Sequence, residues 1–404
     1  MSPPGRRLSR GARRGLAGAG LLIAIAVAAA VIALSGQGDR GGKAAELGNH
    51  RFAHAAASCT PSPSVTRSSG TGSTLLLGVS ASIRVQPAAD RCEEARLAAE
   101  TGVEAVREDL SWAQAEPREN RYDWSSYDGV VRAAIEARLT VLPILDDPPS
   151  WASSGAGCLP TDPRAYASFT AAAVARYGPG GAFWRDNPDL PERPLQWYEL
   201  WNEPWNAPCD RDPAVYARLV VAAVNAGRDT SSAVRFLIDG DTFYTTLGGQ
   251  RADWIAGMYA AVPSLGKYFD ALSIHPYGGD PTVQTPGGDT DNEPGYLVER
   301  AHVELVAHGD GDKPLWVTEI GWSTCSGASA CVTEAQQASY LAEFLHAAVT
   351  TWRSFVRAVF VYDLRDIAPA PANDPEAWYG LLRPDLSPKP AWSVLRSFSD
   401  QLHG

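Results

Sequence analysis

Strand-like and helix-like segments alternate along most of the chain, and this alternation constrains the possible folds more than any other feature. Each of the short apolar segments is followed by a segment with helical spacing of its apolar residues. Such a series over about 330 residues predicts a (β/α)8 TIM barrel. The rival doubly wound sheet normally has a glycine-rich phosphate turn after its first strand, and none follows here. The expected strands are 75–79, 103–107, 139–145, 195–201, 234–239, 271–275, 315–318 and 356–362, and the expected helices are 89–101, 125–137, 163–177, 213–229, 252–261, 294–307, 333–351 and 391–402.

The N-terminal part of the chain predicts export. Residues 1–14 form a basic tail with five arginines, and residues 15–35 carry no charge. This pattern is typical of a membrane anchor or a signal sequence. The uncharged run approaches the roughly 20 residues that span a bilayer, so we favour an uncleaved single-pass anchor over a cleaved signal. Residues 36–73 predict a disordered linker, and residues 74–404 the barrel domain, held outside the cell membrane or secreted.

Composition narrows the class of partner. The chain has 404 residues and a formal net charge of -11, which argues against nucleic acid. Its 13 Trp and 14 Tyr suit stacking on sugar rings, although large cores also use them. We expect no cofactor, and the sequence makes no prediction of oligomeric state.

The cysteines predict disulfides formed in an oxidising compartment, because the chain has six of them and no CxxC motif. Cys325 and Cys331 are near neighbours and are expected to close a small loop. Cys158 and Cys209 fall in the loops after the third and fourth strands, so they can meet, which leaves Cys59 for Cys92. Six buried free thiols are the alternative.

Two of the predicted strands deliver a glutamate at their ends. Residues 197–204 read Trp-Tyr-Glu-Leu-Trp-Asn-Glu-Pro and present Glu203, and residues 315–322 read Leu-Trp-Val-Thr-Glu-Ile-Gly-Trp and present Glu319. Active residues of barrels gather at the carboxyl ends of the strands, and the fourth and seventh strands can face each other across the mouth. Glycoside hydrolysis needs two carboxyl groups, which in retaining enzymes lie roughly 5–5.5 Å apart. We interpret Glu203 as the acid/base and Glu319 as the nucleophile.

These motifs resemble clan A of the retaining glycoside hydrolases, and within it the cellulase-like and family 39-like barrels. The resemblance spans the whole barrel and includes the closing segment 380–391. It implies a strand-four acid/base at Glu203, a strand-seven nucleophile at Glu319, and a carbohydrate substrate, with β-linked oligosaccharides or polysaccharides expected. Many members have a tryptophan platform after strand eight, whereas residues 360–363 here read Phe-Val-Tyr-Asp.

The resemblance also implies roles for three residues around the pair. Arg107, after the second strand, is expected to support the nucleophile. Tyr277, in the sequence His275-Pro276-Tyr277 after the sixth strand, is expected to hydrogen-bond it. Asn202 matches the residue that contacts the sugar 2-hydroxyl. His275, beside Tyr277, is expected to belong to the substrate-binding site as well. The plainer alternatives are that His275 is a core histidine and that Arg107 is a structural partner of Glu199.

Further side chains expected at the mouth of the barrel can be interpreted either as substrate contacts or as structural residues. Trp151, Trp205 and Trp322 are candidate sugar platforms, or else pack within their loops. Acidic residues near the strand ends are candidates for substrate contact, but turns and caps also use them; they are Asp146, Asp147, Asp239, Asp241 and Asp363.

The proposed chemistry sets a condition on the protonation of both glutamates. Glu203 must hold a proton at working pH, so its pKa is expected above the free value of about 4.3. Burial near Trp201 and Trp205 and the charge of Glu319 would raise it. Arg107 and the Tyr277 hydroxyl would keep Glu319 ionised.

Two other classes of function remain open at this point. A non-catalytic carbohydrate-binding barrel would bind glycans without cleaving them. A metal-dependent hydrolase would need a cluster of His and Asp at ligand spacing. His275 is the only histidine at a predicted strand end, so we expect no metal site.

Overall fold

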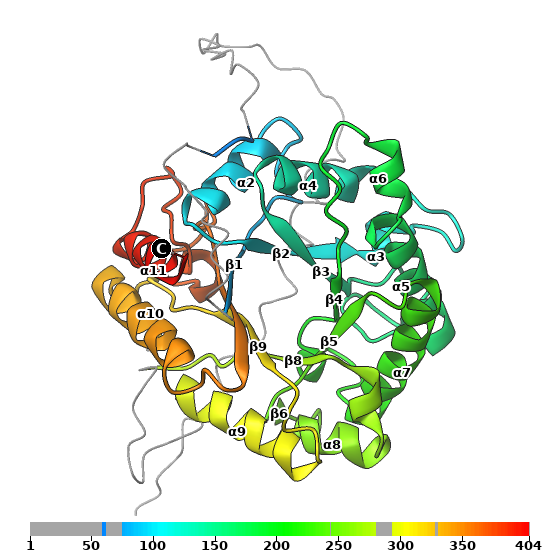
Figure 1. Ribbon diagram of the computed structural model, residues 1–404. Coiled ribbons are helices and arrows are strands. Elements are labelled where there is room, and N and C mark those ends of the chain that lie inside the picture. The colour runs from blue at the N-terminus through cyan, green and yellow to red at the C-terminus, as the bar shows by residue number, and fades with distance from the viewer. Residues whose placement is uncertain (1–58, 62–74, 243, 280–292, 328–329, 404) are drawn as a thin grey trace, which may run out of the picture. The chain divides into compact units, whose positions relative to one another are not determined.

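Eight parallel strands close into a barrel, as the sequence predicts, in a computed structural model that describes residues 59–61, 75–242, 244–279, 293–327 and 330–403. Neighbouring strands pair in chain order, and the last strand pairs with the first, Leu76 opposite Ala358. Helices surround the strands (Figure 1). The barrel strands are β1 (Leu76–Ser80), β2 (Ala105–Ser111), β3 (Thr140–Asp146), β4 (Trp197–Leu200), β5 (Arg235–Asp239), β8 (Ala271–Ile274), β9 (Leu315–Ile320) and β10 (Val356–Val361).

Each predicted helix is present, and two of them have the predicted bounds. Both begin with a proline at the first helical position, which restricts the local backbone and so fixes the helix start. The main helices are α2 (Arg91–Glu100), α4 (Ser125–Glu136), α5 (Pro163–Tyr177), α7 (Pro213–Thr230), α8 (Trp254–Ala261), α9 (Pro294–Ala307), α10 (Glu334–Val349) and α11 (Pro390–His403).

Short elements in the loops were not predicted. They have too few residues to show a period in the sequence. They are α3 (Trp112–Ala115), α6 (Ala182–Asp186), the hairpin of β6 (Tyr244–Thr245) and β7 (Arg251–Ala252), and the 3₁₀ turns η1 (Pro204–Asn206), η2 (Leu265–Tyr268) and η4 (Pro375–Trp378).

Apolar side chains fill the inside of the barrel at one level, and polar ones replace them toward the carboxyl ends. Gly78 leaves room for the Phe360 ring, because a Cβ at Gly78 would lie 2.1 Å from a carbon of that ring. Side chains two residues apart on a strand point to the same side, so Arg107 follows Ala105 into the interior. The apolar layer consists of Ala105, Leu142, Leu237, Ala271, Trp316, Ala358 and Phe360.

The six cysteines pair as predicted. Cys59 bonds to Cys92, Cys158 to Cys209, and Cys325 to Cys331. The predicted basic tail, residues 1–14, and the predicted membrane span, residues 15–35, lie outside the described residues. Of the predicted linker, residues 36–73, only 59–61 are described. Among the helices that are described, none is long and apolar enough to span a membrane.

Candidate active site

Glu203 follows β4 in a backbone conformation that side chains other than glycine rarely adopt. Its φ is 45°, and Trp201 just before it has a φ of 78°. Such left-handed residues persist only where neighbours hold them, and they often mark functional sites. Here the backbone N–H of Glu203 donates to Asp239 Oδ2 over 2.9 Å, and Pro204 begins η1 directly afterwards. Asp239 therefore positions Glu203 and does not simply cap a turn.

Glu319 lies within β9, because this strand extends two residues further than predicted, to Ile320. Its carboxylate is held from two sides. Arg107 Nη1 donates to Oε1 over 2.6 Å, and the Tyr277 hydroxyl donates to Oε2 over 2.7 Å. Both donors favour the ionised form of a carboxylate. The contacts expected of Arg107 and Tyr277 with this glutamate are present.

Arg107 joins the two strands that carry the glutamates. Its guanidinium forms a two-pronged ion pair with Glu199, with Nε to Oε2 at 2.7 Å and Nη2 to Oε1 at 3.0 Å. It also donates to Asn202 Oδ1 over 2.9 Å. Burial opposes its charge, but Glu199 and Glu319 hold the pKa of Arg107 well above its usual range. One guanidinium therefore contacts both Glu199, as the structural reading expects, and Glu319, as the functional reading expects.

His275 lies between the two glutamates. Its Nδ1 is 2.9 Å from Glu203 Oε1 and 3.7 Å from Glu319 Oε2. Its Nε2 is 3.0 Å from Thr318 Oγ1, which fixes the ring orientation. Oxygen atoms of Glu203 and Glu319 lie within 4.8 Å of one another and of this ring. The two carboxylates predicted from distant strands therefore converge at one rim of the barrel.

The charges in this cluster correct the pKa expected for Glu203. Burial alone would raise the pKa of Glu203, but the hydrogen bond and charge of His275 outweigh it, and the pKa lies below its ordinary value. Burial would lower the pKa of His275, whereas the charge of Glu319 and the bond to Glu203 raise it to about 9. The charges and hydrogen bonds of the cluster therefore favour a proton on His275 over one on Glu203.

Two of the three predicted sugar platforms are buried, which corrects that prediction. Trp205 is 5% exposed and lies against Trp254 and His275. Trp322 is 3% exposed, and its indole N–H donates to the carbonyl of Gly279. Neither ring offers an open face to a sugar. Trp151 is half-buried and donates to the carbonyl of Glu116, so it also contributes to loop packing.

The other acidic candidates divide between local structure and burial. Asp147 accepts a hydrogen bond from the Ser111 hydroxyl at the start of its loop. Burial raises the pKa of Asp146 well above its usual range, and the charges of Asp109 and Asp147 add to this. Asp363 is also buried with a raised pKa. The half-buried Asp241 accepts a backbone hydrogen bond from Ile255, in keeping with a turn role.

Two residues of the site escaped sequence reasoning, Ser273 and Thr318. The Ser273 hydroxyl donates to Glu199 Oε1 over 2.9 Å, and it lies 2.5 Å from Thr318 Oγ1. Ser273 stands two residues before His275 and so points to the same face, a signal available in the sequence. Both residues are fully buried and complete the hydrogen bonds beneath the glutamates.

At the mouth of the barrel, two groups of described residues each bring three possible metal ligands together: Glu199, Asp239 and His275, and Glu203, His275 and Glu319. Both groups share His275. A metal needs its imidazole nitrogen unprotonated, while the surrounding carboxylates favour the protonated ring, so a proton competes with any cation for this place.

No family model matches the chain, and no curated protein sequence matches it. The following solved structures of similar fold are distant in sequence. A family 39 glycoside hydrolase from Bacteroides cellulosilyticus WH2 aligns with 23% identity and a TM-score of 0.59 over 81% of this chain. The chain spans 64% of that protein, less than two thirds of its length.

Two further structures have similar scores. The GH5_18 protein from Streptomyces cattleya, solved in complex with GlcNAc, aligns over 82% of this chain and 81% of its own, with 13% identity and a TM-score of 0.58. A monomeric β-xylosidase from Caulobacter crescentus aligns over 82% of this chain and 69% of its own, with 18% identity and a TM-score of 0.57. The chain has the barrel fold of these glycoside hydrolases, and the resemblance to clan A extends to its architecture.

Proposed function

We propose that the chain is a retaining glycoside hydrolase that cleaves an O-glycosidic bond by double displacement. The observation that carries this proposal is the convergence of Glu203 and Glu319, whose oxygen atoms lie within 4.8 Å of one another. An approach this close agrees with the spacing of roughly 5–5.5 Å between carboxyl groups that direct attack requires.

In the first displacement, a carboxylate oxygen of Glu319 attacks the anomeric carbon. The bond from that carbon to the leaving oxygen breaks, and the leaving oxygen takes a proton from Glu203. Arg107 and Tyr277 hold Glu319 in place, since its two oxygens already accept their hydrogen bonds. Asn202, fixed by Arg107, is adjacent to the acid and can contact the sugar.

In the proposed cycle His275 supplies the proton for this step. Its Nδ1 is 2.9 Å from Glu203 Oε1, and the neighbouring carboxylates favour the protonated ring. Transfer along this hydrogen bond produces protonated Glu203 and a neutral imidazole, which keeps its bond to Thr318 through Nε2. A bound sugar that excludes water weakens the ionised form of Glu203 and favours this transfer.

In the second displacement, water attacks the anomeric carbon and the ester bond to Glu319 breaks. Glu203, now a carboxylate, accepts the proton of that water. The proton then passes from Glu203 back to Nδ1 of the neutral His275, and the enzyme returns to its starting state.

We propose an extracellular substrate with β linkages. Disulfides form in oxidising compartments, and three are present. The basic and uncharged N-terminal segments support attachment to the cell membrane. Proteins of the same fold include an exo-β-1,4-mannosidase and a β-xylosidase, so β-mannosides and β-xylosides belong in the first substrate panel.

The proposal is tested with aryl β-glycosides and proton NMR. Hydrolysis with β-anomer appearing first is expected, and Glu319→Gln should lower turnover by about 10⁴-fold or more. A first-formed α-anomer would exclude double displacement on a β-glycoside. Glycan binding without hydrolysis across the panel would support the non-catalytic barrel, and loss of activity with a chelator, restored by zinc, would support the metal-dependent one.

A further inference from the structure

The segment after β10 forms one wall of the mouth. Tyr379 lies next to Tyr277, with ring centroids 5.8 Å apart, and next to Tyr362, at 5.4 Å. Tyr277 is the residue that donates to Glu319. The turn η4, Pro375–Trp378, immediately precedes Tyr379 and therefore stands beside the nucleophile.

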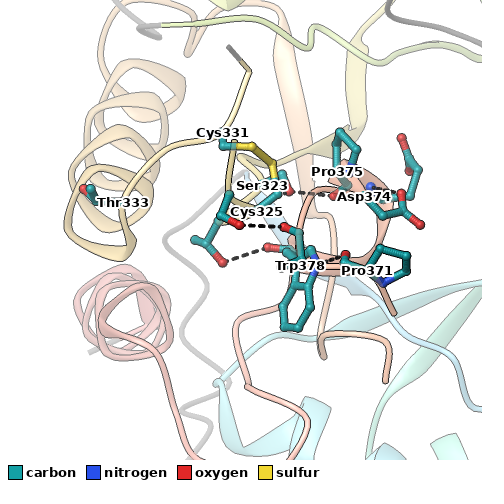
Figure 2. Close-up of a disulfide and its surroundings, with 12 residues drawn as sticks. Ser323, Cys325, Cys331, Thr333, Pro371, Asp374, Pro375 and Trp378 are labelled. Carbon is teal, nitrogen blue, oxygen red and sulfur yellow. Dashed lines mark hydrogen bonds between the residues drawn. A yellow bond between two sulfur atoms is a disulfide. The ribbon is translucent and has the colours of Figure 1, made fainter. Parts of the chain in front are cut away.

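The disulfide between Cys325 and Cys331 lies close to the segment that contains Pro375 and Trp378 (Figure 2). The Ser323 hydroxyl donates to the carbonyl of Pro375 over 2.6 Å. The backbone N–H of Thr324 donates to the carbonyl of Trp378 over 2.9 Å. Both ends of η4 are thus fixed to the loop that follows the strand of Glu319, so the wall has a defined position.

Glu376 lies in the middle of η4, and its side chain has no function in holding the turn. The bond that caps the turn involves its backbone N–H, which donates to Asp374. No hydrogen bond or ion pair within the described protein involves the carboxylate of Glu376, which is half-buried. A half-buried carboxylate without a partner loses hydration and gains nothing in exchange. Such a group is retained where a ligand can bind it.

Electrostatics places Glu376 at the same site as the proposed pair. Burial raises the pKa of Glu376, and the charges of Glu319 and Glu203 raise it further, to about 7. The cations of the mouth are committed elsewhere, Arg107 to Glu199 and Glu319, and His275 to Glu203. An ionised Glu376 therefore adds a negative charge that no described cation balances.

We propose that Glu376 contacts the bound sugar and makes this site select glycosides of neutral or amine-bearing sugars over those of uronic acids. The inference rests on the proposed glycoside hydrolysis and specifies its substrate class. A carboxylate accepts hydrogen bonds from sugar hydroxyls or an ammonium group, but repels the carboxylate of a uronic acid.

The test compares the wild type with Glu376→Gln, which keeps the shape and removes the charge. Three aryl β-glycosides that differ in one group are used, the neutral sugar, its 2-amino-2-deoxy analogue and its uronic acid, at about pH 8 where Glu376 is ionised. The neutral sugar is whichever one the wild type hydrolyses. Asp400→Asn is the matched control, because it removes an exposed charge from α11.

For Glu376→Gln we expect kcat/KM for the uronic acid, relative to the neutral sugar, to rise about tenfold, and that for the amine to fall about tenfold. Asp400→Asn should leave both ratios unchanged. Because no partner is lost and an unfavourable charge is removed, the melting temperature of Glu376→Gln should be no lower than that of the wild type, and Glu376→Ser serves if it is lower. Hydrolysis with unaltered ratios would refute the role of Glu376 alone, whereas absence of hydrolysis of any glycoside would refute the proposed function as well.

Discussion

Two of the places where the barrel domain buries charge differ in how completely the charges are paired. The mouth cluster consists of Arg107, Glu199, Glu203, His275 and Glu319. The tail pair consists of Lys389, just before α11, and Asp366, after β10. The tail pair is closed, with side chains 1% and 2% exposed, whereas those of Glu203 and Glu319 are 18% and 10% exposed.

Hydrogen bonding follows the same division. Lys389 Nζ donates to Asp366 and to Thr324 Oγ1, both over 2.8 Å, and to the carbonyl of Trp378 over 3.2 Å, so all of its donors are used. One cation meets one anion, and the pair ties three segments together. The mouth cluster has two cations for three carboxylates. The fully paired tail pair is suited to holding the fold together. The mouth cluster keeps an excess of accessible carboxylate, which the proposed reaction at a sugar requires.

The largest difference between the mouth cluster and the tail pair is expected in turnover, for the variant Glu203→Ala. Removing the acid should lower turnover of a glycoside with a poor leaving group by about 10³–10⁴-fold. A 2,4-dinitrophenyl glycoside needs no proton, so the first displacement should be nearly unaffected. Steady-state and burst kinetics on both substrates measure this. Equal losses on the two substrates would contradict the role of Glu203 as acid.

Lys389→Met should act on stability instead. It leaves the buried Asp366 without a cationic partner, with only the backbone N–H of Gly380 donating to it, and breaking a buried pair in this way typically costs about 3–5 kcal/mol. Denaturant unfolding measures the loss, and the kcat of folded protein should change far less than in Glu203→Ala. The exposed Lys267→Met is the matched control, and Lys389→Met with Asp366→Leu should recover part of the stability. A full loss in the double variant would mean that the charge pair is not what matters.

The sequence allowed the fold to be predicted because each strand and helix has its own local signal. Residues 163–177 and 294–307 were predicted with the bounds observed, since a proline marks each start. The hairpin of β6 and β7 was missed because its strands have two residues each. The end of β9 was placed too early, since pairing of Ile320 with Val361 on the neighbouring strand extends it.

The site was predictable only as far as barrel geometry dictates it. Strand ends gave the positions of Glu203 and Glu319. The protonation of Glu203 was predicted wrongly, because it depends on a contact with His275 across 72 residues of sequence. The burial of the two tryptophans depends likewise on groups from other parts of the chain. The Trp254 ring packs against Trp205, and the backbone carbonyl of Gly279 accepts a hydrogen bond from Trp322. The position of a residue at the carboxyl end of a barrel strand predicts that it lies at the mouth, but does not predict which side chains pack over it.

The mouth cluster should also respond to pH through His275. The folded-state pKa of about 9 lies above the unfolded value of about 6.5, so its contribution to stability is complete below pH 6.5 and is lost as the pH rises toward 9. We expect the free energy of unfolding to decrease across this window by at most about 1.4 kcal/mol per pH unit. Denaturant unfolding at a series of pH values measures it. His275→Gln should flatten this part of the profile, and an unchanged slope would assign it to other groups.

The smallest expected effect comes from the disulfide that backs the wall of the mouth. Cys325 and Cys331 are 6 residues apart, against 51 for Cys158 and Cys209. Constraint of the unfolded chain grows with the length of the closed loop, so removing the first bridge should cost about 2 kcal/mol and removing the second about 4 kcal/mol. Double replacements by alanine, compared by denaturant unfolding, measure both.

The same pair of variants separates stability from positioning. The loop of the short bridge holds η4 through Ser323 and Thr324, so its removal should raise KM more than removal of the longer bridge, although it costs less stability. A KM that tracks the loss of stability in both variants would mean that the bridge merely stabilises the fold. A KM that rises only in the Cys325 and Cys331 variant would place this bridge with the mouth cluster in function, even though it lies beside the tail pair, whose Lys389 also binds Thr324.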